Sequence, residues 1–226
     1  MKIRILTAFG MGLVLLFSLL FLPHVAISVC FIIVGVLALY ELGAAMKYSD
    51  PIDSNHYWVE FVMLLFSCAA VIVVFDNYLM GYLIILCALV DVGGFTTGKL
   101  LGKKAHRVAS LKNISPNKSW EGYIVGVICS VGLGIVFFKV LEAHLPAKAF
   151  WFCLFAWIPS IIGDLYESAL KRRLHVKDSA DRVLNGKNKL MKLLEAPVKS
   201  HGGYLDRIDS FIFVSVAYVI FNSIWQ

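Results

Sequence analysis

Residues 122–141 read GYIVGVICSVGLGIVFFKVL and contain one charged side chain, Lys139. The run is continuously apolar, whereas a β-strand facing lipid would alternate polar and apolar residues. Its length matches the roughly 20 residues that an α-helix needs to cross the hydrocarbon of a bilayer. The stretch therefore predicts a transmembrane helix.

The composition of the whole chain agrees with this prediction. Hydrophobic residues make up 59% of the 226 residues and charged residues only 16%, whereas a soluble domain carries about a quarter charged residues. One soluble core could not bury so much apolar surface, which indicates an integral membrane protein. The five cysteines each fall inside an apolar run without a CxxC pair, so we interpret them as small buried hydrophobes and not as a disulfide framework or zinc site.

Six further apolar runs resemble the first. They predict spans at about 5–22, 25–46, 58–75, 78–97, 149–170 and 211–225. The fold class predicted is thus all-α, a polytopic bundle of about seven transmembrane helices in a single domain, 1–226. Glu41, near the end of the second span, could lie at the interface or face inward; we favour the interior because carboxylates buried in membranes usually have partners.

The distribution of basic residues predicts the orientation. With the N-terminus in the cytoplasm, 19 of the 21 lysines and arginines fall on the cytoplasmic side, and only Lys139 and Lys148 lie outside. This asymmetry satisfies the positive-inside rule and predicts a C-terminus on the outer side. It also explains the net charge of +6 without a nucleic-acid partner. Loops 98–121 and 171–209 then face the cytoplasm together, and we expect them to form the functional site.

One polar stretch, residues 163–209, stands out between the apolar runs. It holds ten of the 21 basic residues together with seven carboxylates. Carboxylates beside cations suit Mg²⁺ and phosphate chemistry. A solvated loop that merely obeys membrane charge rules is the alternative explanation.

Two clusters within this stretch favour function. If the sixth span continues as a helix to Arg172, four polar residues share one of its faces (Asp164, Glu167, Ser168 and Lys171). Such a stripe is costly at membrane depth unless it lines a hydrated site. In the second cluster, 201–209 (HGGYLDRID), the glycine turn can bring backbone amides to an anion and Arg207 can pair with a phosphate. Helix capping would also explain Asp206 and Asp209, and both roles stay open.

Four ordered segments resemble one family. They are Ser115–Gly122 (SPNKSWEG), Ser168–Arg172 (SALKR), Lys177-Asp178, and His201–Asp209 (HGGYLDRID). Together they are similar to the signature segments of the phosphatidate cytidylyltransferases, also called CDP-diacylglycerol synthases. Asp91 and Glu41 also fit that family's pattern, and the likeness runs from about residue 38 to 210.

The resemblance implies a Mg²⁺-dependent nucleotidyltransferase of phospholipid biosynthesis. It would join CTP and phosphatidate into CDP-diacylglycerol and pyrophosphate, with its active site on the cytoplasmic face of a bacterial inner membrane. A monovalent cation such as K⁺ beside the Mg²⁺, and a homodimer, are left open. A nucleic-acid partner is not expected.

The resemblance also implies roles for individual residues. Catalytic roles fall on Lys171, Arg172, Lys177, His201 and Arg207. Substrate binding falls on Asp91, Lys118, Ser119, Glu121, Ser168, Gly202 and Gly203. Metal binding falls on Asp164, Asp178, Asp206 and Asp209.

The chain departs from the family at one place. Between Asp178 and His201 lie 22 residues, where about ten are usual, and Lys199-Ser200 replaces a Pro-Gly pair. This insertion, 181–199, leaves a catalytically altered paralogue as an alternative. A membrane transporter is the other alternative; it would carry charges in mid-span, whereas most charges here gather at one face.

Overall fold

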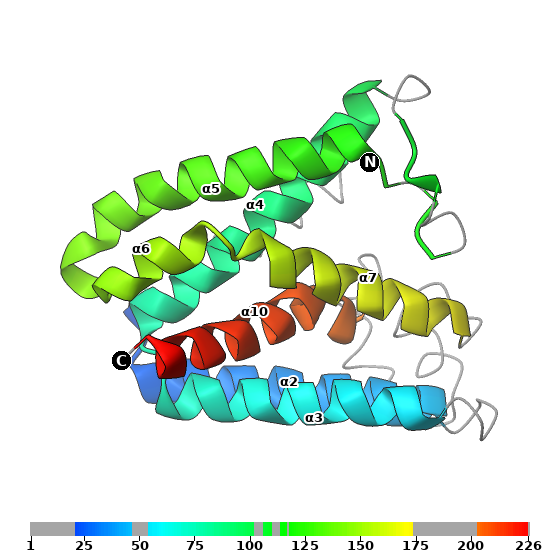
Figure 1. The fold of residues 1–226 in the computed structure, drawn as a ribbon. Helices are drawn as coiled ribbons and strands as arrows, with labels where there is room; N and C mark the ends of the chain where they lie inside the picture. The colour runs from blue at the N-terminus through cyan, green and yellow to red at the C-terminus, as the bar shows by residue number, and fades with distance from the viewer. Residues whose placement is uncertain are drawn as a thin grey trace. The chain divides into compact units, whose positions relative to one another are not determined.

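The computed structural model describes residues 21–46, 54–101, 106–109, 114–116, 118–173 and 203–225, and every statement below concerns these residues. Their named elements are all helical (Figure 1). The helices are α2 (His24–Met46), α3 (Ser54–Val73), α4 (Asn77–Leu101), α5 (Trp120–Leu141), α6 (Ala147–Cys153), α7 (Trp157–Arg173) and α10 (Leu205–Ile224), with a short 3₁₀ turn, η4 (Glu142–His144), after α5. The all-α prediction is confirmed.

The chain divides into two compact units. Unit 1 comprises Met1–Asn77 and Leu170–Ile208, and unit 2 comprises Tyr78–Ala169 and Asp209–Gln226. The division falls within α7 and within α10, so each of these helices contributes residues to both units.

In unit 1, α2 and α3 pack against each other, and Figure 1 shows them side by side in blue and cyan. The contact is close at Gly35, where an added Cβ would lie 2.7 Å from the Cys68 Sγ. An added methyl group would have to displace the Cys68 side chain, so the glycine favours the close approach of the two helices. Asn77 fastens the start of α2, since its amide donates to the Leu22 carbonyl (2.9 Å) and its Oδ1 lies 3.1 Å from His24 Nδ1.

A carboxyl group lies in the buried face of α3. Glu60 is fully buried, as are Leu64 and Ser67, which follow it at helical spacing on the same face. Neither carboxyl oxygen of Glu60 accepts a hydrogen bond from the described part of the chain. Burial of a polar group without a partner costs free energy, so Glu60 is a destabilising feature of an otherwise apolar contact.

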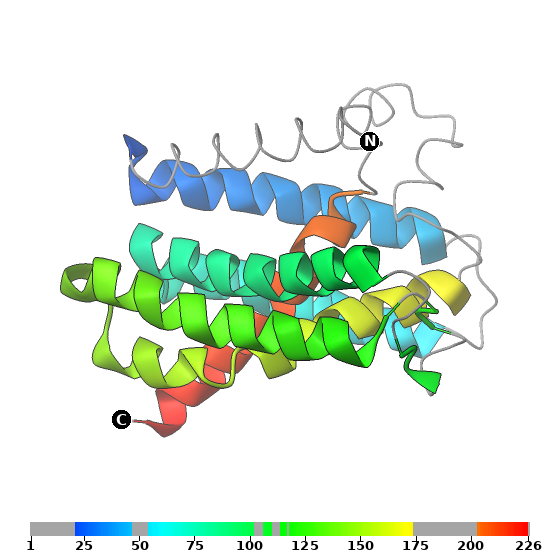
Figure 2. The same cartoon turned by 90° about the horizontal axis from the view of Figure 1, so that it is seen from above.

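In unit 2, α4 and α5 lie side by side, as Figures 1 and 2 both show. Small residues allow the close approach: an added Cβ at Gly93 would lie 2.7 Å from the Gly126 Cα, and one at Gly126 would lie 2.8 Å from the Val90 carbonyl oxygen. One side chain from each helix also donates a hydrogen bond to a backbone carbonyl of the facing helix: Tyr82 of α4 to Gly134, and Ser130 of α5 to Leu86. This pattern of small residues and polar contacts is typical of helix pairs in membranes.

The first half of α7 packs against α10 within unit 2. An added Cβ at Gly163 would lie 2.7 Å from the Asp209 carbonyl oxygen, and the Ser210 hydroxyl donates to the Ser160 carbonyl at 3.1 Å. Further along, the ring of Tyr218 meets the ring of Phe152 edge to face. The contacts at Gly163 and Ser160 hold this part of α7 against Asp209 and Ser210 of α10.

The sequence prediction of one continuous sixth span at 149–170 is wrong in one respect. The structure breaks it into α6 and α7, which are bent by 56°. Pro159 explains the break, because it has no N–H to donate to the Phe155 carbonyl and its ring crowds that group. The Phe155 carbonyl accepts from Ile158 N at 3.0 Å instead.

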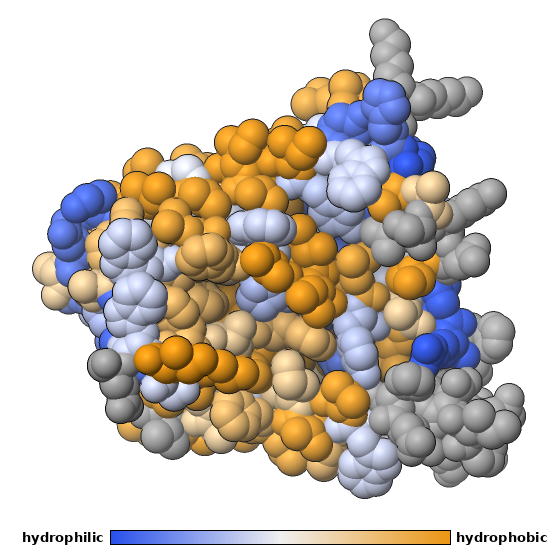
Figure 3. All heavy atoms as spheres, in the orientation of Figure 1, coloured by the Kyte–Doolittle hydropathy of each residue, from blue (hydrophilic) through white to orange (hydrophobic). Residues whose placement is uncertain are grey.

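The apolar helices make this an integral membrane protein. Four described helices (α2, α4, α5 and α10) are long and apolar enough to cross a bilayer, and the bent α6–α7 pair would make a fifth. On α5, Ile124, Ile128 and Val140 are each more than half exposed, as expected for side chains that face lipid. Figure 3 shows the apolar surface along α5, with hydrophilic residues gathered at its ends. The predicted span 5–22 lies almost wholly outside the described residues, and the count of seven spans and their orientation stay predictions.

Candidate functional site

The polar cluster of unit 2 is centred on Lys118. Its ammonium forms an ion pair with the Asp164 carboxylate of α7, and the Lys118 and Asp164 side chains are 31% and 23% exposed. Asp91, on α4, acts electrostatically on the same ammonium. Burial lowers the pKa of Lys118, but Asp164 and then Asp91 raise it by more, so its pKa lies above the ordinary value. The lysine is therefore held in its charged form, which suits an anionic ligand.

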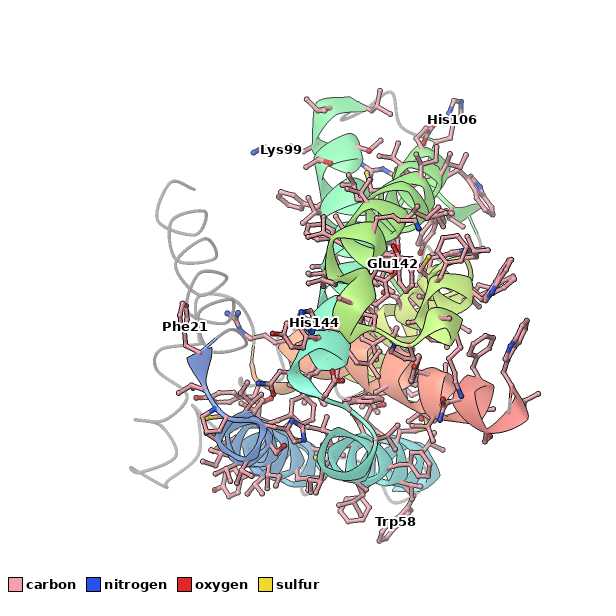
Figure 4. The ribbon with its side chains drawn as sticks, turned by 90° about the vertical axis from the view of Figure 1, so that its left-hand side faces the viewer. Phe21, Trp58, Lys99, His106, Glu142 and His144 are labelled. Carbon is pink, nitrogen blue, oxygen red and sulfur yellow. The ribbon has the colours of Figure 1, made fainter. Side chains whose placement is uncertain are left out.

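The connection between α4 and α5 positions Lys118. The Val108 N–H donates to the Lys118 carbonyl (3.2 Å), and the Trp120 N–H donates to the His106 carbonyl (3.1 Å). Glu121 reinforces this pairing, because both of its oxygens accept from the His106 N–H at 3.1 Å and it also contacts the His106 ring. Figure 4 shows His106 at the outer edge of unit 2, and Lys99 extending away from α4. The predicted loop 98–121 is thus helical at both ends and paired in part between them.

Ser119 and Glu121 have local roles in this arrangement. The Ser119 hydroxyl caps α5 by accepting a hydrogen bond from the Gly122 N–H at 3.2 Å. Glu121 lies in the first turn of α5, where a carboxylate also favours the helix dipole. Their predicted contacts with substrate stay predictions, since the structure explains both residue types by helix initiation.

Tyr123 belongs to the same cluster and was missed by the sequence analysis. Its ring centroid lies 6.0 Å from the Lys118 Nζ. Its hydroxyl is buried and makes no hydrogen bond within the described residues. Such a group is available to a ligand oxygen. Tyr123 lies one turn into α5, which begins two residues after Lys118. This spacing from Lys118 is the sequence signal that could have identified the tyrosine.

The second polar cluster lies in unit 1, at the end of α7 and the start of α10. Lys171 Nζ lies 3.4 Å from the Asp206 Oδ1, and both side chains are largely buried. The adjacent Arg207 has its Nε and Nη2 atoms buried without a hydrogen-bond partner within the described part of the chain. An arginine needs such donors satisfied, so this guanidinium can accept an anionic ligand without giving up a protein contact at those atoms.

Glu41 anchors the start of α10 within unit 1. It is fully buried. Its Oε1 accepts the Tyr204 N–H at 2.7 Å, and its Oε2 accepts the Leu205 N–H at 2.9 Å. The interior position that we favoured for Glu41 is confirmed, and its partners are backbone amides.

The predicted stripe on α7 is helical throughout, because α7 runs to Arg173. Glu167 is 1% exposed, while Ser168 and Asp164 are partly exposed. In the first turns of α10, the Asp209 Oδ1 accepts the Ser210 N–H at 2.6 Å. Asp206 lies in the first helical turn, which fits the capping role left open above.

The described carboxylates supply oxygen ligands of the type that Mg²⁺ prefers. Asp164 and Asp206 each lie beside a lysine, and no three side chains of the His, Cys, Asp or Glu type gather into a metal-binding group within the residues that the structure describes. The predicted ligand Asp178 lies outside those residues. The magnesium assignment stays a prediction that the donor chemistry fits.

Several other predicted residues also lie outside the described part of the chain. They are Lys177, His201, Gly202 and the insertion 181–199. Gly203, which is described, is buried two residues before the start of α10. Arg172 is exposed in the last turn of α7.

Comparison with known proteins places the chain in a family. The sequence model of the cytidylyltransferase family matches residues 61–225. The phosphatidate cytidylyltransferase of Bacillus subtilis is 37% identical over 145 residues, which are 62% of this chain and 46% of that protein. That of Helicobacter pylori strain J99 is 35% identical over 150 residues, which are 64% of this chain and 48% of that protein.

A plant relative also matches. The chloroplastic phosphatidate cytidylyltransferase 4 of Arabidopsis thaliana is 34% identical over 140 residues, covering 61% of this chain and 32% of that protein. The matched stretch thus spans less than half the length of each of these three relatives. No solved structure matches the chain. Because the family match extends over most of its length, this chain belongs to the cytidylyltransferase family.

Proposed function

We propose that the protein transfers the cytidylyl group of CTP to phosphatidate, forming CDP-diacylglycerol and pyrophosphate. Its membership of the cytidylyltransferase family and the names of its bacterial and plant relatives support this activity. A lipid phosphate also suits a protein whose described helices are apolar and whose charged residues gather near helix ends.

The observation that carries the proposal is the state of Arg207. Its buried Nε and Nη2 have no protein acceptor within the described residues. A guanidinium offers two parallel donors that match two oxygens of one phosphate group. Because Lys171 lies beside Asp206, the residue before Arg207, a second cation is held close to the same turn. We assign phosphate binding to this pair of cations.

The reaction asks mainly for alignment and charge neutralisation. A phosphate oxygen of phosphatidate attacks the α-phosphorus of CTP, a new P–O bond forms, and the bond to the β-phosphate oxygen breaks as pyrophosphate leaves. Phosphoryl-type transfer of this kind gains most from in-line positioning and from cations that meet the developing charge. Arg207 and Lys171 would hold the phosphate oxygens in place and neutralise part of their charge.

Mg²⁺ is part of the proposal. The family resemblance assigns metal binding to Asp178 and Asp206 in unit 1 and to Asp164 and Asp209 in unit 2, and a bound Mg²⁺ would neutralise phosphate charge. A metal ion would require these carboxylates in their ionised form. A monovalent cation beside the Mg²⁺ belongs to the same proposal.

The topology of the proposed enzyme follows from its basic residues. We place the N-terminus and the active site on the cytoplasmic side of a bacterial inner membrane, with seven spans and the C-terminus outside. We also propose that the enzyme forms a homodimer.

A substitution series at Arg207 tests the function. Purified protein in detergent micelles is supplied with labelled CTP, phosphatidate and Mg²⁺, and lipid-linked cytidine is counted. We expect Arg207→Gln to lower kcat/KM by about 100-fold or more, the size of effect seen when one donor to a developing oxyanion is removed. The kcat/KM of Arg207→Lys should lie between those of the wild type and Arg207→Gln, because lysine keeps the charge and loses the paired donors.

Arg173→Gln is the matched control, because Arg173 is exposed in the last turn of α7 and should leave the rate unchanged. A wild-type protein that binds CTP and releases no pyrophosphate would contradict the proposed activity and indicate an altered paralogue. Equal rates for wild type and Arg207→Gln would contradict the assignment of phosphate binding to Arg207.

A further inference from the structure

Glu41 makes an unusual contact for a carboxylate inside a membrane helix. It lies on α2 and is fully buried, and its two oxygens accept the backbone N–H groups of Tyr204 and Leu205 at 2.7 and 2.9 Å. Carboxylates are costly at membrane depth and are kept where they meet strong partners. Two short hydrogen bonds to backbone amides meet that requirement.

The two amides belong to the start of α10. The first N–H groups of any helix lack partners inside the helix, and a carboxylate satisfies them and also favours the helix dipole. Here the capping group comes from a residue more than 160 positions away in the sequence. The contact therefore fixes the place where α10 begins relative to α2, within unit 1.

The residues that follow directly carry the proposed phosphate chemistry. Asp206 and Arg207 are the second and third residues of α10, and the Arg207 N–H donates to the Tyr204 carbonyl at 3.2 Å. Any shift of the Tyr204–Leu205 amides is thus passed on through one turn of backbone. A displacement of about 1 Å at a binding group is enough to lower a rate strongly.

We infer that Glu41 is a positioning residue for Arg207: its carboxylate sets the first turn of α10 so that the guanidinium meets a phosphate group. This inference rests on the proposed cytidylyltransfer reaction. Glu41 touches no substrate in this account and acts only through the helix start that it caps.

The test is a double-substitution cycle between Glu41 and Arg207. Glu41→Gln keeps the shape of the side chain but leaves one acceptor where there were two, so kcat/KM should fall about tenfold, as expected for a lost hydrogen bond to a charged group. In an Arg207→Lys background, the same change should lower kcat/KM less than about twofold, because the group that Glu41 positions is already altered. A role in stability alone would give the same loss in both backgrounds and would overturn the inference.

Two further variants sharpen this test. Glu41→Asp keeps both acceptors on a shorter side chain and should recover part of the rate that Glu41→Gln loses. Glu142→Gln, which changes an exposed carboxylate after α5, should change nothing. Full activity of Glu41→Gln in a wild-type background would also overturn the inference while leaving the proposed function intact.

A measurement that needs no turnover separates this inference from the proposed function. Amide hydrogen exchange at Tyr204 and Leu205 should speed up in Glu41→Gln, while exchange along α5 stays as in the wild type. If the wild type makes no lipid-linked cytidine, the proposed function fails and this local exchange still reports on the capping contact. Unchanged exchange at both amides would overturn the contact itself.

Discussion

Gly163 on α7 faces the Asp209 carbonyl oxygen on α10 so closely that an added Cβ would lie 2.7 Å from it. The Ser210 hydroxyl continues this contact by donating to the Ser160 carbonyl. The two helices can meet here only because residue 163 has no side chain. In unit 2 this glycine therefore allows the polar part of α7 to pack against α10.

The first prediction concerns this contact. Gly163→Ala should lower the melting temperature by several degrees, because the methyl group meets backbone and neither helix can yield cheaply. Gly132→Ala on α5 is the matched control, since nothing lies within 4 Å of an added Cβ there. That control should hold or raise the melting temperature, as alanine is favoured over glycine inside a helix. Equal melting temperatures for the two variants would contradict the close packing.

The second prediction concerns pH and Lys118. Asp164 and Asp91 raise its pKa in the folded protein, so the stabilisation is fully present below the pKa of an unfolded lysine, about 10.4. It is lost as the pH rises through the higher folded value. The gap in melting temperature between wild type and Lys118→Met should therefore be constant from pH 7 to about 9.5 and shrink above pH 11. A gap that stays constant across this whole range would contradict the charged pair.

The third prediction concerns Glu60. Its carboxyl is fully buried on α3 and neither oxygen accepts a hydrogen bond from the described residues. Replacement by an apolar side chain of similar length, Glu60→Met, should raise the free energy of unfolding by about 1–3 kcal/mol, the cost of an unsatisfied buried polar group. Thermal denaturation in micelles measures the change. A lowered melting temperature would show that the carboxyl has a stabilising partner.

The fourth prediction concerns the carboxylate beside Lys171. Asp206→Asn should abolish CTP-dependent pyrophosphate release, because the change removes a charge that would hold Mg²⁺. The protein should still insert into the membrane, which its recovery from the membrane fraction at wild-type levels would show. Near-normal turnover across a Mg²⁺ titration would contradict the assignment of Asp206 to the metal.

Much of the fold could be predicted from the sequence, since long apolar runs determine where α2, α4, α5 and α10 lie. The break between α6 and α7 was missed because a run of apolar residues was given more weight than Pro159, the residue that prevents a continuous helix. The burial of Glu60 has no sequence signal of its own, because a lone carboxylate in an apolar helix can also face the interface.

The site could be predicted only in part. Motifs identified Lys118, Asp164, Lys171 and Asp206, but not that the first two pair across 46 positions of sequence or that the last two pair with each other. Such pairs depend on how helices pack, which periodicity does not report. Glu41 was expected to have a buried partner, but periodicity could not show that the partner is the backbone at the start of α10. For Ser119 the motif predicted substrate contact, whereas the structure shows that its hydroxyl caps α5.

The most direct test of the central claim is the fate of two labels in one reaction. Purified protein is given phosphatidate, Mg²⁺ and CTP labelled separately at the α- and γ-phosphorus. We expect the α label to enter the lipid fraction in a one-to-one ratio with γ label released as pyrophosphate. Release of γ label as inorganic phosphate, or no transfer of α label to lipid by an intact protein that binds CTP, would contradict it.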